Sequence, residues 1–186
     1  TLPATTGSTD WVIWDNWQLT YYGNKETSYD AFVKEIVAKN LAKYEEQMDK
    51  MTNGMFDTYS AAVSGLTATD FAGITAAQEA MTAAAAVVDA NIAAWTEYKK
   101  LYEEADGLTA DPDIDQDSEY MADVAIYVML DGADIFDSME LETEPLLAEI
   151  EKLAKMVNDA KKKSLNLDLN RDEEEVEIYV GISLLS

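Results

Sequence analysis

The chain contains no cysteine and no histidine, and Arg171 is its single arginine. Without these side chains it can form no disulfide, thiolate nucleophile or imidazole base, and it lacks the usual zinc and copper ligand sets. A serine–histidine triad is excluded for the same reason. The sequence therefore predicts a protein that is not an enzyme.

Positive charge is also scarce, with 13 Lys and Arg against 37 Asp and Glu and a formal net charge of −24. Such a chain repels nucleic-acid phosphates and anionic membrane surfaces, so we expect no nucleic-acid partner. No purely apolar run approaches the roughly 18 residues that span a bilayer. We therefore also expect no transmembrane segment.

Glycine (8) and proline (3) are few, whereas aromatic residues make up 10% of the chain and apolar residues 48%. Disordered acidic chains have the opposite composition, so this composition indicates a folded protein with one sizeable core. We expect residues 1–10 to be a flexible tail and residues 11–186 to form a single helix-rich domain.

Apolar residues recur every three or four positions over residues 28–63 and again over residues 75–105. This spacing predicts two long amphipathic helices, which we expect to pack as an antiparallel hairpin. Asn53-Gly54 is a point at which the first helix could kink or split. A further helix is predicted from Thr143 or Glu144 to the lysines 161–163, where cations favour the end of a helix. A shorter element is predicted from Ser118 to Gly132, within which residues 124–130 are also apolar enough for a buried strand.

Both ends of the chain show the strict alternation of apolar and polar residues that is typical of strands. The alternating stretches are residues 11–22, 165–170 and 176–184. We expect the N-terminal strand and a C-terminal β-hairpin to form a small antiparallel sheet against the helices. The predicted fold class is therefore α+β.

Residues 101–151 hold 17 acidic residues and no lysine or arginine. Within them, carboxylates alternate as they do at the start of an EF-hand calcium loop. Gln116 replaces the glycine of that loop and Ala122 replaces its bidentate glutamate, so the pattern predicts at most an irregular calcium site, and a solvated acidic loop is the competing interpretation. The candidate metal ligands are Asp111, Asp113, Asp115 and Asp117, and no other cofactor is expected.

Two sets of residues are candidates for interaction surfaces. Trp14 and Tyr22 alternate away from the expected core face, where flat rings could stack on carbohydrate. The C-terminal strand could offer its unpaired edge to a neighbouring subunit, unless the strand at residues 11–22 covers that edge. Its apolar residues are Val176, Ile178, Val180 and Ile182.

The sequence therefore favours a non-enzymatic structural or assembly subunit of a cell surface, an appendage or a virion, acting outside the cell through protein–protein contacts, including contacts between copies of the chain. The alternative is an extracellular module that binds carbohydrate or calcium. A further alternative is an acidic intracellular adaptor or nucleic-acid mimic.

Overall fold

The computed structural model describes residues 26–165. These residues form six α-helices and one short 3-10 helix, and 78% of them are helical. The elements in chain order are α1 (Glu26–Glu45), η1 (Met48–Lys50), α2 (Met55–Val63), α3 (Phe71–Leu108), α4 (Glu119–Met129), α5 (Asp131–Ser138) and α6 (Thr143–Lys163).

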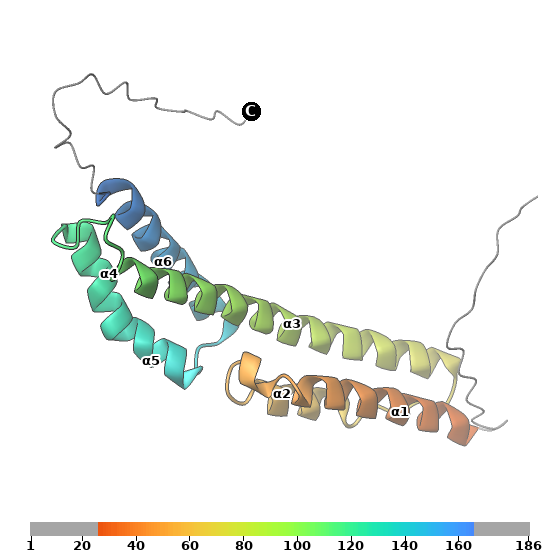
Figure 1. Cartoon of the computed structure of the whole chain (residues 1–186). Coiled ribbons are helices and arrows are strands. Elements are labelled where there is room, and N and C mark those ends of the chain that lie inside the picture. The colour runs from red at the N-terminus through yellow and green to blue at the C-terminus, as the bar shows by residue number, and fades with distance from the viewer. Residues whose placement is uncertain (1–25, 166–186) are drawn as a thin grey trace, which may run out of the picture.

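Helix α3 is the axis of the molecule, and the other helices pack along its two halves (Figure 1). Its 38 residues make it about 57 Å long at 1.5 Å per residue. Helices α1 and α2 lie along its N-terminal half, and α4, α5 and α6 lie along its C-terminal half. The described residues are thus two small helical bundles that share one long helix.

The predicted antiparallel hairpin is only partly present, because the chain turns between Met51 and Gly54. Gly54 has φ = +81°, a left-handed conformation that glycine adopts at little cost. The chain reverses there, so that α2 runs antiparallel to α3 while α1 runs parallel to it (Figure 1). The residues expected to form one long helix therefore form two helices of opposite direction.

The α+β prediction is wrong, since the described residues contain no strand and no sheet. Their one β-contact is an isolated antiparallel bridge between Ile114 and Leu165. Residues 124–130, where a buried strand was an alternative, form the second half of α4 and its C-cap. Helices bury one another's apolar stripes along α3, so this core has no need of a sheet face. The predicted strands at 11–22, 176–184 and nearly all of 165–170 lie outside the described residues.

Two clusters of buried apolar residues form the core, one in each half of the molecule. The first joins α1 and α2 to the N-terminal half of α3 and includes Val33, Tyr44, Tyr59, Met81 and Val88. The second joins the other half of α3 to α4 and α6 and includes Trp95, Tyr98, Val124, Leu146 and Leu153. The predicted stripe of the second long helix is confirmed at Met81, Val88 and Trp95, and Ile92 is partly buried.

A buried hydrogen-bond network lies between the two clusters. Asn91 of α3 is fully buried, and its Nδ2 donates to Thr52 Oγ1 at 2.8 Å and to Thr143 Oγ1 at 3.1 Å. Thr52 Oγ1 also accepts from Trp95 Nε1 at 3.0 Å and donates to the carbonyl of Leu141. The network ties the turn before α2 and the start of α6 to the middle of α3.

By length and composition alone, α3 could cross a membrane, and it is the one described helix that meets these criteria. Core helices of soluble proteins meet the same criteria, so this is weak evidence for a span. In the most apolar stretch of 18 residues in this helix, only 17% of the residues are buried within the structure. The N-terminal half of α3 therefore presents an apolar surface outward.

Candidate functional site

The acidic loop between α3 and α4 uses its carboxylates to hold its own backbone. Asp111 Oδ1 accepts from the backbone N–H of Asp113 at 2.9 Å, and Asp115 Oδ1 accepts from that of Asp117 at 3.1 Å. The side-chain amide of Gln116, which stands where an EF-hand has glycine, donates to the carbonyls of Leu108 and Asp111. The loop is closed by side-chain-to-backbone bonds of the kind found in turns.

The four candidate calcium ligands thus lie on one short loop, but Asp113, Asp115 and Asp117 are exposed, and two of the four carboxylates already accept backbone hydrogen bonds. Within residues 26–165 no group of three acidic side chains is arranged so that it could hold a metal ion. Calcium binding by this loop stays a prediction of the sequence. The candidate interaction residues Trp14, Tyr22, Val176, Ile178, Val180 and Ile182 lie outside the described residues.

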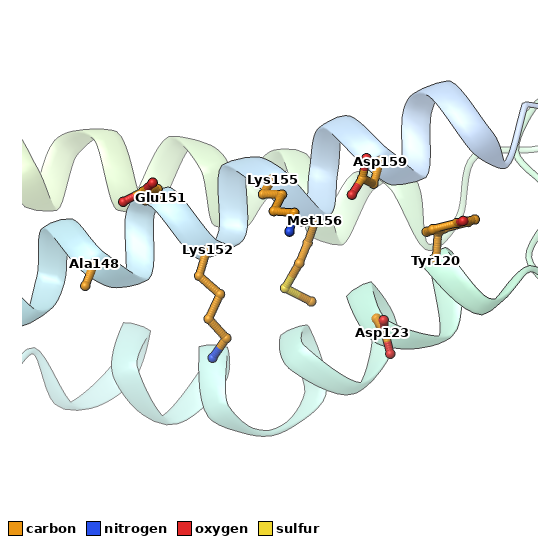
Figure 2. A pocket seen from close by; sticks show the side chains of 8 residues that line it. All are labelled: Tyr120, Asp123, Ala148, Glu151, Lys152, Lys155, Met156 and Asp159. Atoms are coloured by element: carbon orange, nitrogen blue, oxygen red, sulfur yellow. The ribbon is translucent and has the colours of Figure 1, made fainter.

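A groove of about 560 Å³ runs between α4 and α6 and is lined by apolar or aromatic side chains and by acidic and basic ones (Figure 2). Lys152 and Met156 extend from α6 toward α4, across the groove from Asp123. The residues that line it are Tyr120 and Asp123 of α4 and Ala148, Glu151, Lys152, Lys155, Met156 and Asp159 of α6.

The two lysines that line this groove, Lys152 and Lys155, differ in their ion-pair and hydrogen-bond partners. Lys152 Nζ lies 3.2 Å from Glu149 Oε2 and 4.8 Å from the centre of the Tyr127 ring. Lys155 is exposed and has no ion-pair or hydrogen-bond partner among residues 26–165. Asp159, at one end of the groove, is bound by Lys163 at 3.2 Å. Lys155 is therefore the cation in this groove that remains available to another group.

Positive charge is concentrated in the second half of α6, of which Lys152 and Lys155 line the groove. From Lys152 to Lys163 the helix carries five lysines and one carboxylate, Asp159, in a chain whose net charge is −24. Helical spacing places Lys152, Lys155, Lys162 and Lys163 on one face. From the sequence pattern only the last three lysines stood out, as cations that favour the end of a helix, and Lys152 and Lys155 were missed. Their concentration within twelve residues of an acidic chain was the signal that could have found them.

A second groove, of about 610 Å³, lies between α1 and α3 and includes Lys43 and Asp89. Here the charged groups are already paired. Asp89 accepts from the Tyr44 hydroxyl at 2.9 Å and lies 3.9 Å from Lys43 Nζ, which also donates to Tyr44 Oη. This groove therefore offers fewer free charged groups to a ligand than the groove between α4 and α6.

A chain of buried hydroxyls leads from the core to the α4–α6 surface. The hydroxyls of Tyr98 and Tyr127 lie 3.2 Å apart, Tyr98 donates to the carbonyl of Gly132, and Tyr127 donates to Glu149 Oε2. Burial raises the pKa of Tyr98 to about 12, and burial together with the Tyr98 contact raises the pKa of Tyr127 above its usual range. Both phenols are neutral near pH 7, so they serve as structural hydrogen-bonding groups and not as bases.

Comparisons with protein-family models, with curated proteins and with solved structures found no match for this chain.

Proposed function

We propose that this protein is a non-enzymatic assembly subunit that self-associates through the outer face of the N-terminal half of α3, in a surface structure, an appendage or a virion. The observation that supports this proposal is the scarcity of charge on that face. Between Phe71 and Ala94 the helix carries two charged residues, Glu79 and Asp89, whereas 27% of the whole chain is charged.

The face is continuous and built mainly of small side chains. Its residues recur at helical spacing and are all exposed: Ala72, Ala76, Ala80, Ala83, Val87 and Ala90. Val87 is 57% exposed, and Phe71 at the start of the helix is 74% exposed. Contiguous exposed apolar surface of this kind is typical of interaction sites, and small side chains let a second helix approach closely.

The high negative charge sets how self-association should respond to salt. Two copies of a chain of charge −24 repel each other, and salt screens that repulsion. Association through a face that carries only Glu79 should therefore strengthen as salt is raised. We expect the weight-average mass of the full chain, measured by sedimentation equilibrium, to increase with concentration and to increase further at about 0.5 M NaCl.

The surface is tested by replacing Ala83 and Ala90 with glutamate. Glutamate is a good helix former, so the helix should persist, but two carboxylates would be buried in the contact. We expect at least about ten-fold weaker association, which corresponds to about 1.4 kcal/mol. The matched control is Ala38→Glu with Ala42→Glu, at exposed positions of α1, which should change association far less. A full chain that stays monomeric at high concentration and high salt would exclude self-association.

A further inference from the structure

The outer side of α4 is apolar and exposed. Ile126 is 58% exposed, Met129 is 76% exposed, and Leu130, the C-cap residue of the helix, is 59% exposed. Helical spacing places Ile126 and Met129 on the side opposite to the buried side of α4, which packs against α3 and α6. These three residues form the outer face of α4. Large apolar side chains that are exposed together in this way mark an interaction surface.

The side chains at both ends of this face are negatively charged. Glu119 and Asp123 precede it on α4, and Asp131 and Asp134 follow it in the first turn of α5. All four residues are exposed, and none of their carboxylates has an ion-pair or hydrogen-bond partner among residues 26–165. The chain has no lysine or arginine between residues 101 and 151 that could supply one.

The lysines of the neighbouring helices leave most of this negative charge uncompensated. Lys152 is already paired within α6, and Lys99 of α3 lies over the ring of Phe136, near the other end of α5. Lys155 lines the same groove as Asp123 but forms no ion pair with it. Even where Lys155 offsets Asp123, the other three carboxylates have no cation beside them among the described residues.

We infer that the outer face of α4 is the docking site for a basic amphipathic helix of a partner protein. The exposed face of one helix is a narrow ridge, which packs best against a second helix with apolar residues at the same spacing. The apolar side of the partner covers Ile126, Met129 and Leu130, and its lysines or arginines reach the unpaired carboxylates at both ends of the face.

The same charges disfavour two other occupants of this face. A second copy of the face would bring unpaired carboxylates against one another, and an anionic membrane surface would be repelled. The inference does not rest on self-association through the N-terminal half of α3, because α4 lies along the C-terminal half (Figure 1).

A labelled synthetic peptide of leucine and lysine, with leucine at every third or fourth position, provides the probe. Its binding to the full chain is measured by fluorescence anisotropy. The control peptide has the same composition, but its leucines are spread around the helix. A chain of charge −24 attracts both peptides equally, so a difference reports the apolar contact. We expect at least about ten-fold tighter binding of the amphipathic peptide. Equal affinity for the two peptides, or no binding, would overturn the inference.

Substitution by glutamine locates the contact without changing the charge. Glutamine is a good helix former, so α4 should persist in Ile126→Gln with Met129→Gln. We expect this variant to bind the amphipathic peptide at least about ten-fold more weakly. The matched control is Val87→Gln with Phe71→Gln on α3, whose residues are 57% and 74% exposed. Equal losses in the two variants would contradict docking at α4.

The charged part of the contact is tested by Asp131→Asn with Asp134→Asn. The amphipathic peptide should bind this variant about two- to ten-fold more weakly, the range for two exposed ion pairs. Asp49→Asn with Asp57→Asn is the matched control, because both residues are exposed and lie in the first turns of η1 and α2. A loss that is no larger than in this control would mean that these carboxylates do not contact the peptide.

The two proposals can fail separately because their readouts differ. Self-association is measured by mass and strengthens with salt, whereas peptide binding should weaken when NaCl is raised to about 0.5 M. Val87→Gln with Phe71→Gln should weaken self-association and leave peptide affinity unchanged, and the α4 variant should do the reverse. Peptide binding that strengthens with salt would overturn the inference of a basic partner while leaving the α3 proposal intact.

Discussion

Asn91 and Thr52 bind each other through two hydrogen bonds at the centre of the molecule. Asn91 Oδ1 accepts from the backbone N–H of Thr52 at 2.9 Å, and Asn91 Nδ2 donates to Thr52 Oγ1 at 2.8 Å. Both residues are buried, and they lie between the two apolar clusters. Two polar side chains thus connect the halves of the fold along α3.

Replacing Thr52 with valine should be costly because it removes one oxygen that serves several partners. Asn91 Nδ2 would lose one of its two acceptors, and Trp95 Nε1 and the Leu141 carbonyl would lose the Thr52 hydroxyl. We expect a loss of about 1–3 kcal/mol in unfolding free energy, measured by denaturant titration. Thr82→Val, at an exposed position of α3, should cost under about 0.5 kcal/mol. Similar losses for both variants would show that the network adds no stability.

Two buried tyrosines should respond in opposite ways to replacement by phenylalanine. Tyr59 Oη is buried and has no hydrogen-bond partner among residues 26–165, so Tyr59→Phe should leave stability unchanged or increase it. Tyr98 Oη contacts Tyr127 and Gly132, and Tyr98→Phe should cost about 0.5–1.5 kcal/mol. Thermal unfolding of the two variants side by side makes the comparison. A larger loss for Tyr59→Phe would contradict the arrangement of both hydroxyls.

Replacement by alanine should destabilise the fold at Gly132 and stabilise it at Gly107. A Cβ at Gly132 would lie 2.7 Å from Tyr127 Cε1 and 2.8 Å from the Tyr127 carbonyl oxygen, so Gly132→Ala should cost about 1–3 kcal/mol. A Cβ at Gly107, near the end of α3, meets nothing within 4 Å, and alanine there should add about 0.5–1 kcal/mol. Chemical denaturation measures both. If Gly132→Ala were neutral, the packing of Tyr127 against the start of α5 would be wrong.

Stability should fall at alkaline pH because the buried phenols resist ionisation. Tyr98 has a pKa of about 12, and the pKa of Tyr127 is also raised, whereas in the unfolded chain both lie near the usual value of about 10. Above pH 10 the unfolded state therefore loses these protons first. Unfolding free energy should be unaffected by these groups below about pH 9 and should fall as pH rises from about 10 to 12.

The slope of that fall is at most about 1.4 kcal/mol per pH unit for each tyrosine. The double variant Tyr98→Phe with Tyr127→Phe should show a shallower slope, although Tyr44 and Tyr59 still contribute because their pKa values are also raised by burial. Melting temperatures of the wild type and the double variant, measured across this pH range, would show the difference in slope. Parallel curves for wild type and double variant would mean that these two phenols ionise in the folded protein as they do in the unfolded chain.

The candidate site could be predicted from the sequence only in part. The helical period of residues 143–163 predicted α6, and the count of lysines after Lys152 was visible in the sequence. Which of these lysines line a groove depends on α4 lying beside α6, and that Lys155 has no partner among the described residues depends on where each nearby carboxylate points. Both are long-range relationships that helical spacing does not contain.

The sequence by itself determined that the chain lacks the side chains of most catalytic and transition-metal sites, that it is strongly acidic, and where most helical residues lie, because composition and local periodicity carry that information. Only the tertiary structure decided that α1 and α2 run in opposite directions, since Gly54 permits a reversal but Asn91 and Thr52 hold the turn against α3. It likewise decided that the described core is helical throughout. The apolar stripe of each helix is buried against another helix, and no local sequence pattern specifies which helix that is.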